Sequence, residues 1–412
     1  METKLLNFKN GLPVIFIKDE HNPLAYAYFM VNAGAKDEKK STAGLAHAVE
    51  HFLFTGSQNY SKKDLLDIPS WFGSSLEGYT DLDFTSFGFR VLKEHCEPML
   101  QMMADMLIRP QFLDVAIKEE IKVILTEMAV SDDDEDEQLA SELHSCFGID
   151  KQQALVFGTK ESVSHLTAVD ARKFWETYYT AENSVLCLYG NGSMLDMAEK
   201  YFEPMRSGYK STSAVHSFSA NPYRISRGGS DVQLTLIFPE EKRFSAADEI
   251  LAMVIGNTYS SRLCSKLRSE LSLVYAVSAN IDSYACGDIF YITTSCLHKN
   301  LLAVVDVVCQ EIVRIRENGI TEDELKCAYN NLKTELWELH ENPSDLIVEY
   351  CEDFLLGRFI PIEDKLKLFN QVTVAEVNAS AQRIFAQKPS FGVIGNPKSF
   401  PNYAYLLNRL KM

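Results

Sequence analysis

Several features that would place this chain in a special class are missing from its sequence. The amino terminus, METKLLNFKNGLPV, lacks the basic segment and the long apolar segment of a secretory signal. No uninterrupted apolar run is long enough to span a membrane, and no low-complexity stretch indicates a disordered chain. We therefore expect a folded, cytoplasmic protein that has no membrane partner.

Basic residues and paired cysteines are also scarce. The formal net charge is -17, so the phosphate backbone of a nucleic acid would be repelled by the molecule as a whole. The nine cysteines are scattered, their number is odd, and no Cys-x-x-Cys pair is present. This pattern is typical of reduced thiols in a cytosolic protein. The sequence thus argues against a nucleic-acid partner and against a disulfide-stabilised secreted fold.

The middle and the end of the 412-residue chain resemble each other. LTAVDARKFWETYYTAENSVLCLYGN ends at Asn191, and VTVAEVNASAQRIFAQKPSFGVIGN ends at Asn396. Each segment begins with a helix N-cap signature and ends with an apolar strand that is followed by Gly-Asn. The copies are about 200 residues apart, which indicates a duplicated domain of ordinary size.

A segment rich in Ser, Gly and Asn separates the two copies and shows no sustained periodicity, so we interpret it as a linker. We divide the chain into an N-terminal domain of residues 1–215, a linker of residues 216–230 and a C-terminal domain of residues 231–412. In both halves, apolar strands and hairpins come first and amphipathic helices follow. This order predicts an α+β fold in which each domain is a mostly antiparallel sheet with helices packed on one face.

The motif HAVEH at residues 47–51 places metal-competent side chains in the apolar run LAHAVEHFLF. On a helix, His47 and His51 lie one turn apart, and Glu50 lies within the same arc of about 100°. Two imidazoles at this spacing can chelate one zinc ion, and the carboxylate would be placed to take a proton from water that zinc activates. The alternative is a pair of partly buried histidines bound to a glutamate, but burying such groups without a strong partner is costly.

Two histidines leave such a site one protein ligand short of the usual three. The predicted helix DVAIKEEIKVILTEMAV offers Glu119, Glu120 and Glu127. Glu120 and Glu127 are seven residues apart and share one helix face, so one could bind the metal while the other hydrogen-bonds a ligand. The spacing does not say which of the two is the ligand, and an exposed acidic stripe is the alternative.

With its flanks, the motif reads GLAHAVEHFLFTGS, and it matches the H-x-x-E-H pattern of inverted zinc peptidases. Along its whole length the chain resembles the M16 family, which includes pitrilysin, insulin-degrading enzyme and the mitochondrial processing peptidase. The resemblance implies a zinc-dependent endopeptidase with one zinc ion per chain. It implies that Glu127 is the third ligand of the zinc ion, that Glu120 is a supporting acidic residue and that Glu50 is the general base.

A second segment, LRSELSLVYAVSA, resembles the part of the family's second domain whose arginine and tyrosine face the zinc site. The matching residues are Arg268 and Tyr275, which could hydrogen-bond a substrate carbonyl and support its developing negative charge. The alternative is a surface arginine and a core tyrosine. Alignment of EILAMVIGN with GLAHAVEH places Met253, Gly256 and Asn257 opposite the zinc motif, so we expect the second domain to bind no zinc.

The chain departs from the family pattern at three positions. Glu77 replaces a neutral amide in the edge strand that contacts the substrate backbone, which weakens the expectation of this contact and favours a basic or amine-bearing substrate. Pro69 interrupts a segment that is usually helical. Ser272 stands where a basic residue or glycine is common.

The resemblance also implies an assembly and a class of substrate. Full-length members have four such domains, so we expect this two-domain chain to dimerise around a chamber for peptides or unfolded segments, which would add as a strand near residues 75–87. A homodimer would be self-sufficient, and the alternative is a heterodimer with a metal-free homologue, in which this chain is the catalytic subunit of a peptide-maturation protease. The remaining hypotheses are a non-catalytic assembly subunit and a zinc hydrolase with a non-peptide substrate.

Overall fold

The chain forms two compact units in a computed structural model that describes residues 2–131, 145–147, 155–211, 217–220, 222–240, 244–395 and 401–412. The first unit comprises Met1–Ser141, Ile149–Ser213 and Asn342–Phe359, and the second comprises Glu142–Gly148, Ala214–Glu341 and Ile360–Met412. Asn396 and residues 216 and 221 of the expected linker lie outside the described residues. No helix in the described ranges combines the length and the apolar character needed to cross a membrane.

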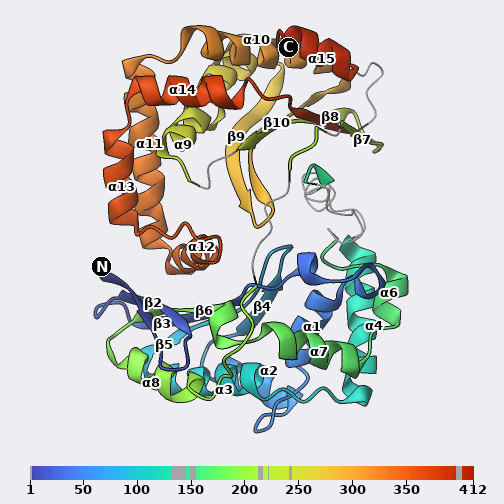
Figure 1. The fold of residues 1–412 in the computed structure, drawn as a ribbon, viewed down its shortest axis with the longest axis vertical. Helices are drawn as coiled ribbons and strands as arrows, with labels where there is room; N and C mark the ends of the chain where they lie inside the picture. The colour runs from blue at the N-terminus through green and yellow to red at the C-terminus, as the bar shows by residue number, and fades with distance from the viewer. Residues whose placement is uncertain are drawn as a thin grey trace. The chain divides into compact units, whose positions relative to one another are not determined.

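The first unit is built on a six-stranded sheet in the order β1-β2-β6-β3-β5-β4 (Figure 1). Neighbouring strands are antiparallel except for β2 and β6, which are parallel. β4 is an edge strand, paired with β5. The strands are β1 (Glu2–Asn7), β2 (Pro13–Lys18), β3 (Leu24–Val31), β4 (Leu76–Thr80), β5 (Thr85–Leu92) and β6 (Ser184–Gly190).

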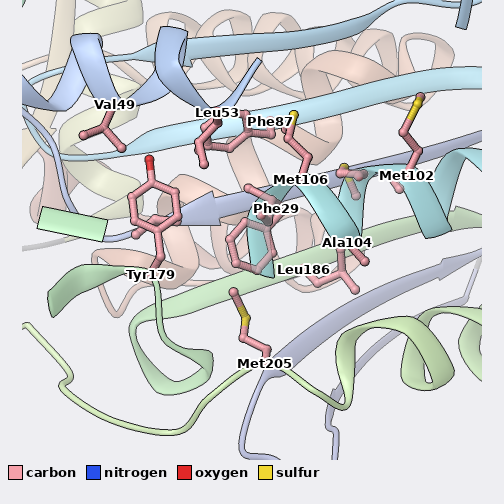
Figure 2. Packing of buried hydrophobic residues seen from close by; sticks show 14 of the residues in the cluster. Phe29, Val49, Leu53, Phe87, Met102, Ala104, Met106, Tyr179, Leu186 and Met205 are labelled. Atoms are coloured by element: carbon pink, nitrogen blue, oxygen red, sulfur yellow. The ribbon is translucent and has the colours of Figure 1, made fainter. Parts of the chain in front are cut away.

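The helices of this unit supply most of the partners for the inner face of the sheet. Alternate residues of a strand point to the same face, and on this face Phe29, Phe87 and Leu186 pack with Val49 and Leu53 of α1 (Figure 2). The helices are α1 (Leu45–Leu53), α2 (Lys62–Trp71), α3 (Cys96–Ile108), α4 (Asp114–Ser131), α6 (Lys160–Ser164), α7 (Ala168–Tyr178) and α8 (Ser193–Phe202).

The opposite face of the sheet is covered by a helix from far along the chain. α12 (Pro343–Leu355) belongs to the first unit and packs against β6 and β3. A strand with one face in solvent usually alternates apolar and polar residues, but all seven residues of β6 are buried because α12 covers its second face. Cys187 of β6 and Cys351 of α12 are fully buried at this contact. The expected layer of helices on one face is thus supplemented by one helix on the other.

The second unit contains a five-stranded sheet in the order β7-β11-β8-β10-β9. Its strands are β7 (Tyr223–Ile225), β8 (Asp231–Glu240), β9 (Val274–Tyr284), β10 (Gly287–Leu297) and β11 (Ser390–Ile394). The accompanying helices are α9 (Ala246–Ala252), α10 (Leu301–Asn318), α11 (Glu322–Glu341), α13 (Ile362–Gln371), α14 (Val374–Ile384) and α15 (Tyr403–Arg409).

The two sheets repeat one topology. β2, β6, β3, β5 and β4 are neighbours in the first sheet, as β7, β11, β8, β10 and β9 are in the second. The same neighbour pair is parallel in both sheets, β2 with β6 and β7 with β11. This agreement confirms two homologous α+β domains. β7 lies within the segment that we interpreted as a linker, because a strand of three residues is too short to show a period.

One helix differs from the expectation, and another has an irregular extension. α2 continues through Pro69 and ends at Trp71, so the prediction that Pro69 interrupts the helix is wrong. The missing N–H of Pro69 costs α2 one backbone hydrogen bond, to the carbonyl of Leu65, and the helix ends two residues further on. In the second unit, α9 continues as a π-helical segment over Met253–Asn257. A Cβ atom on Gly256 would lie 2.6 Å from the backbone nitrogen of Ala279, so glycine permits the close packing of this segment on β9.

Candidate metal centre

The N-terminus of α1 is anchored by a buried carboxylate. Glu38 accepts hydrogen bonds of 2.6 Å from the backbone N–H groups of both Gly44 and Ala46. A carboxylate is favourable here because it meets unpaired N–H groups at the positive end of the helix dipole. Gly44 has φ of 88°, and a Cβ atom there would lie 2.6 Å from the carbonyl oxygen of Phe157. The start of α1 is therefore tightly defined, and with it the direction of His47, which lies on its first turn.

The three predicted metal ligands converge. The Nε2 atoms of His47 and His51 are 3.2 Å apart, and Oε2 of Glu127 on α4 lies 3.8 Å from the first and 3.3 Å from the second. Potential ligand atoms of these residues all lie within 4.8 Å of one another. Two ligands bound at about 2.0–2.1 Å to one tetrahedral zinc ion are about 3.3 Å apart. The arrangement therefore fits a zinc ion held by two imidazoles and a carboxylate.

Glu120 fixes the ring of His51. Its Oε1 lies 3.1 Å from Nδ1 of His51, and an Nδ1–H group that donates to this carboxylate leaves the lone pair of Nε2 for a metal. This hydrogen bond holds the pKa of Glu120 below its usual value, helped by Lys62 and opposed by burial. Burial lowers the pKa of His51, but Glu120, Glu50 and Glu127 outweigh it and raise the pKa. The carboxylates that favour a proton here also favour a metal cation.

His47 is a buried, neutral ligand candidate. Its side chain packs edge to face on the ring of Phe157, at a centroid distance of 4.7 Å. Burial, with a smaller contribution from His51, lowers the pKa of His47 to about 3, so the ring keeps an unprotonated nitrogen at neutral pH. Nδ1 of His47 is buried and has no hydrogen-bond partner among the described residues. Burying such a polar ring costs free energy unless a ligand compensates for it.

Glu50 lies on the side of α1 that faces the edge strand β4. Its Oε2 accepts a hydrogen bond of 2.6 Å from the hydroxyl of Thr80. Burial raises the pKa of Glu50, although the hydrogen bond from Thr80 opposes this effect. A carboxylate whose pKa is raised accepts protons more readily than an exposed one, as a general base requires.

Gly78 of β4 makes room for this carboxylate. A Cβ atom on Gly78 would lie 2.6 Å from Oε1 and 2.7 Å from Cγ of Glu50. We expect Gly78→Ala to displace the carboxylate and to lower kcat/KM for peptide cleavage by at least about 10-fold, since a misplacement of about 1 Å can cost about 100-fold. Zinc content should not change. The control is Gly192→Ala, at a glycine whose added Cβ atom would have no neighbour within 4 Å. Wild-type kcat/KM in Gly78→Ala would contradict this account of Glu50.

Lys62, the first residue of α2, contacts the second oxygen of Glu120. Glu120 is thus held between His51 and Lys62. We expect Lys62→Met to weaken zinc binding by about 10-fold, at the low end of the roughly 10–100-fold effect of losing an outer partner of a metal ligand. The effect should be at this end because the Lys62 side chain is 49% exposed.

Competition with a zinc-binding dye would measure the affinity of the Lys62→Met variant. Lys63→Met is the matched control, because Lys63 is exposed and pairs with Asp67 instead. Equal zinc affinity in the Lys62→Met variant and the wild type would show that Lys62 does not support the site.

The two candidate residues of the second domain lie together. Arg268 belongs to the π-helical segment Cys264–Glu270, and Tyr275 lies at the start of β9. The guanidinium carbon of Arg268 lies 5.2 Å from the ring centroid of Tyr275. Tyr275 is 83% exposed, so it is not a core residue. Between them, Ser272 has φ of 52°, a left-handed conformation that glycine adopts more easily.

The second domain uses the positions opposite HAVEH for packing. Oδ1 of Asn257 accepts a hydrogen bond of 2.8 Å from the backbone N–H of Ala279, and its Nδ2 donates to Asn280. Met253 is buried. Over the described residues of the whole chain, the one group of three or more His, Cys, Asp or Glu with converging ligand atoms is that of α1 and α4.

Four residues of these sites lie outside the motifs of the sequence. Thr80, Gly78 and Lys62 contact Glu50 or Glu120 across long stretches of chain, and Tyr259 contacts Arg268 from a separate turn. None of these residues belongs to a metal-ligand pattern. The only local signal is the pair Gly78 and Thr80, which are separated by one residue and therefore share a face of the edge strand β4.

Comparisons with known proteins define the class of this chain. The family model described as Insulinase (Peptidase family M16) matches residues 13–156, and the model described as Peptidase M16 inactive domain matches residues 165–332. The chain therefore belongs to the M16 peptidase family.

Particular relatives extend over nearly the whole chain. An uncharacterized zinc protease of Rickettsia felis is 25% identical over 398 residues, which is 94% of this chain and 96% of the relative. The uncharacterized zinc protease YmxG of Bacillus subtilis is 22% identical over 408 residues, or 96% and 98% of the two chains.

Two solved structures share the fold. One is a peptidase M16 inactive domain from Pseudomonas fluorescens, with a TM-score of 0.85, 18% identity and coverage of 98% of this chain and 100% of the other. The other is a protease from Helicobacter pylori, with a TM-score of 0.81, 16% identity and coverage of 95% and 99%.

Proposed function

We propose that this chain is a zinc-dependent endopeptidase in which His47, His51 and Glu127 bind one zinc ion. The observation that carries the proposal is the convergence of two imidazole nitrogens and one carboxylate oxygen at 3.2, 3.3 and 3.8 Å. The names of the relatives, which are zinc proteases, support the same metal and the same class of reaction.

The residues around the ligands supply the remaining functions. A bound zinc ion would polarise the scissile carbonyl and lower the pKa of the attacking water. Glu50 then takes the proton from that water and later delivers it to the amine that leaves. Thr80 holds one oxygen of Glu50, so that the carboxylate keeps its orientation during both transfers. Glu120 keeps the ring of His51 in the tautomer that a metal requires.

The substrate would bind as an extended strand along β4. An edge strand offers unpaired backbone groups to a peptide, and Gly78 and Thr80 of this strand face Glu50. Glu77 is exposed on the alternate face, where its carboxylate accepts a hydrogen bond of 2.6 Å from Ser75. Its negative charge would favour peptides with basic or amine-bearing groups.

The second domain would contribute Arg268 and Tyr275 as hydrogen-bond donors to a substrate carbonyl. The expected assembly is a homodimer that encloses the substrate, and a heterodimer with a homologous subunit is the alternative. The mass of the purified protein, measured together with its activity in the absence of any other chain, distinguishes the two assemblies.

Digestion of a mixed peptide library by the purified chain tests the proposal. Mass spectrometry should detect cleavage that a chelator abolishes and that one equivalent of zinc per chain restores. Cleavage that resists the chelator would contradict the assignment of zinc. A chain that binds zinc but cuts small esters or amides and no peptide would be a hydrolase of another kind. A chain that cuts none of these would be a non-catalytic subunit.

A further inference from the structure

Arg268 lies between two exposed aromatic rings. Its guanidinium carbon is 4.9 Å from the ring centroid of Tyr259 and 5.2 Å from that of Tyr275. Tyr259 is 76% exposed and Tyr275 is 83% exposed. Tyr259 lies in the turn between the segments Met253–Asn257 and Cys264–Glu270, outside the motif that led to the other two residues. Neighbouring aromatic rings with so much exposed surface indicate a binding site rather than a part of the core.

The hydrogen-bonding groups of Arg268 have no partner among the residues that the structure describes. Within the described part of the chain, its guanidinium makes no hydrogen bond and no ion pair, and the nearby carboxylate of Glu270 is paired with Lys266. An arginine that stacks on tyrosine rings can bind a further ligand through the N–H groups at the edge of its plane. Oxygen acceptors of a peptide, such as carbonyl groups, fit these donors.

We propose that Tyr259 is a positioning residue for Arg268: its ring holds the guanidinium so that the N–H groups of Arg268 are presented to a peptide carbonyl oxygen. The inference rests on the proposed peptidase function and extends it to a residue outside the motifs. A free arginine side chain must lose rotamer freedom when it binds, and this loss weakens the binding. Stacking on the Tyr259 ring removes part of that freedom in advance.

A double-mutant cycle on the full-length, zinc-loaded protein tests the positioning role. Tyr259→Ala should lower kcat/KM for a peptide by about 5-fold, as expected for loss of an exposed cation–π contact, and Tyr259→Phe should retain wild-type activity because the ring is kept. In an Arg268→Met background, Tyr259→Ala should have no further effect, because nothing remains to be positioned. Tyr405→Ala removes a tyrosine stacked on Arg409 at 5.1 Å and serves as the control for loss of such a stack elsewhere.

Two results of the cycle would overturn the inference. One is an unchanged kcat/KM in Tyr259→Ala. The other is the same 5-fold loss with and without Arg268, which would mean that Tyr259 acts independently. The zinc content and the melting temperature of each variant are measured as well. If Tyr259→Ala lowers activity only because it lowers the zinc content or the melting temperature, the positioning role is also rejected.

A binding assay separates the failure of this inference from that of the proposed function. Fluorescence anisotropy of a labelled, unstructured peptide with the Glu50→Gln protein needs no catalysis. Tyr259→Ala in this background should weaken binding, and Tyr259→Phe should not. If the wild type cuts no peptide, the anisotropy measurements alone test the inference. The inference is then rejected if the protein binds no peptide, or if Tyr259→Ala does not change the affinity. If the wild type cuts peptides and Tyr259→Ala matches it in both assays, only the inference fails.

Discussion

Replacement of Glu50 by glutamine should lower peptide cleavage by about 100-fold to about 10,000-fold while the protein continues to bind one zinc ion per chain. The range is that of a lost general base. Glutamine has nearly the same shape, and its carbonyl oxygen can still accept the hydrogen bond from Thr80. The neutral amide avoids the cost of burying a charge, so stability should not fall. A fluorogenic peptide assay gives kcat, and elemental analysis gives the zinc content.

The matched control for Glu50→Gln is Glu119→Gln, at an exposed residue of α4. It makes the same chemical change away from the ligands and should leave kcat unchanged. Retention of more than about a tenth of the activity by Glu50→Gln would assign the general base to another group, because a positioned base contributes about 100-fold or more.

The second large effect is expected at Glu127. Glu127→Ala should weaken zinc binding by more than about 100-fold, because the loss of an outer partner alone costs roughly 10–100-fold and Glu127 is proposed to bind the metal directly. Its Oε2 atom lies 3.3 Å from Nε2 of His51. Competition with a chromophoric chelator measures the affinity, and activity should fall with zinc occupancy.

Glu120→Ala and Glu119→Ala complete this series on α4. Glu120→Ala should have an intermediate effect, since Glu120 contacts Nδ1 of His51 rather than Nε2, and Glu119→Ala should have none. If Glu120→Ala lost more zinc affinity than Glu127→Ala, the assignments of ligand and supporting residue would have to be exchanged.

Glu120 and Glu127 show which part of the site can be predicted from the sequence and which part cannot. The seven-residue spacing predicts that Glu120 and Glu127 share a helix face, and both do reach the ring of His51. Which of them binds the metal depends on how α4 is placed along α1, and that placement comes from packing between helices more than 60 residues apart in the chain. The helical period contains no information about it; the family resemblance was needed to choose Glu127.

The fold, like the site, could be predicted only in part. Helical spacing indicates α1 and α4, the order of strands before helices indicates the α+β class, and the repeat of 205 residues between Asn191 and Asn396 indicates two related domains. The periods do not reveal β7, which is too short, or the site where α12 packs, since an amphipathic pattern names the buried face of a helix but not its partner. Tyr275 was equally ambiguous, because an aromatic residue in an apolar segment is typical of both a core and a binding surface.

The position of α12 has a consequence for how the protein is made. The chain up to residue 215 contains every strand of the first sheet, but the helix that covers the outer side of β6 and β3 ends only at Leu355. Synthesis proceeds at about 5–20 residues per second. The outer side of β6 and β3 therefore stays exposed to solvent until α12 and most of the second half have left the ribosome. The N-terminal half of the chain by itself therefore lacks the helix that covers this side of its sheet, and the C-terminal half supplies that helix.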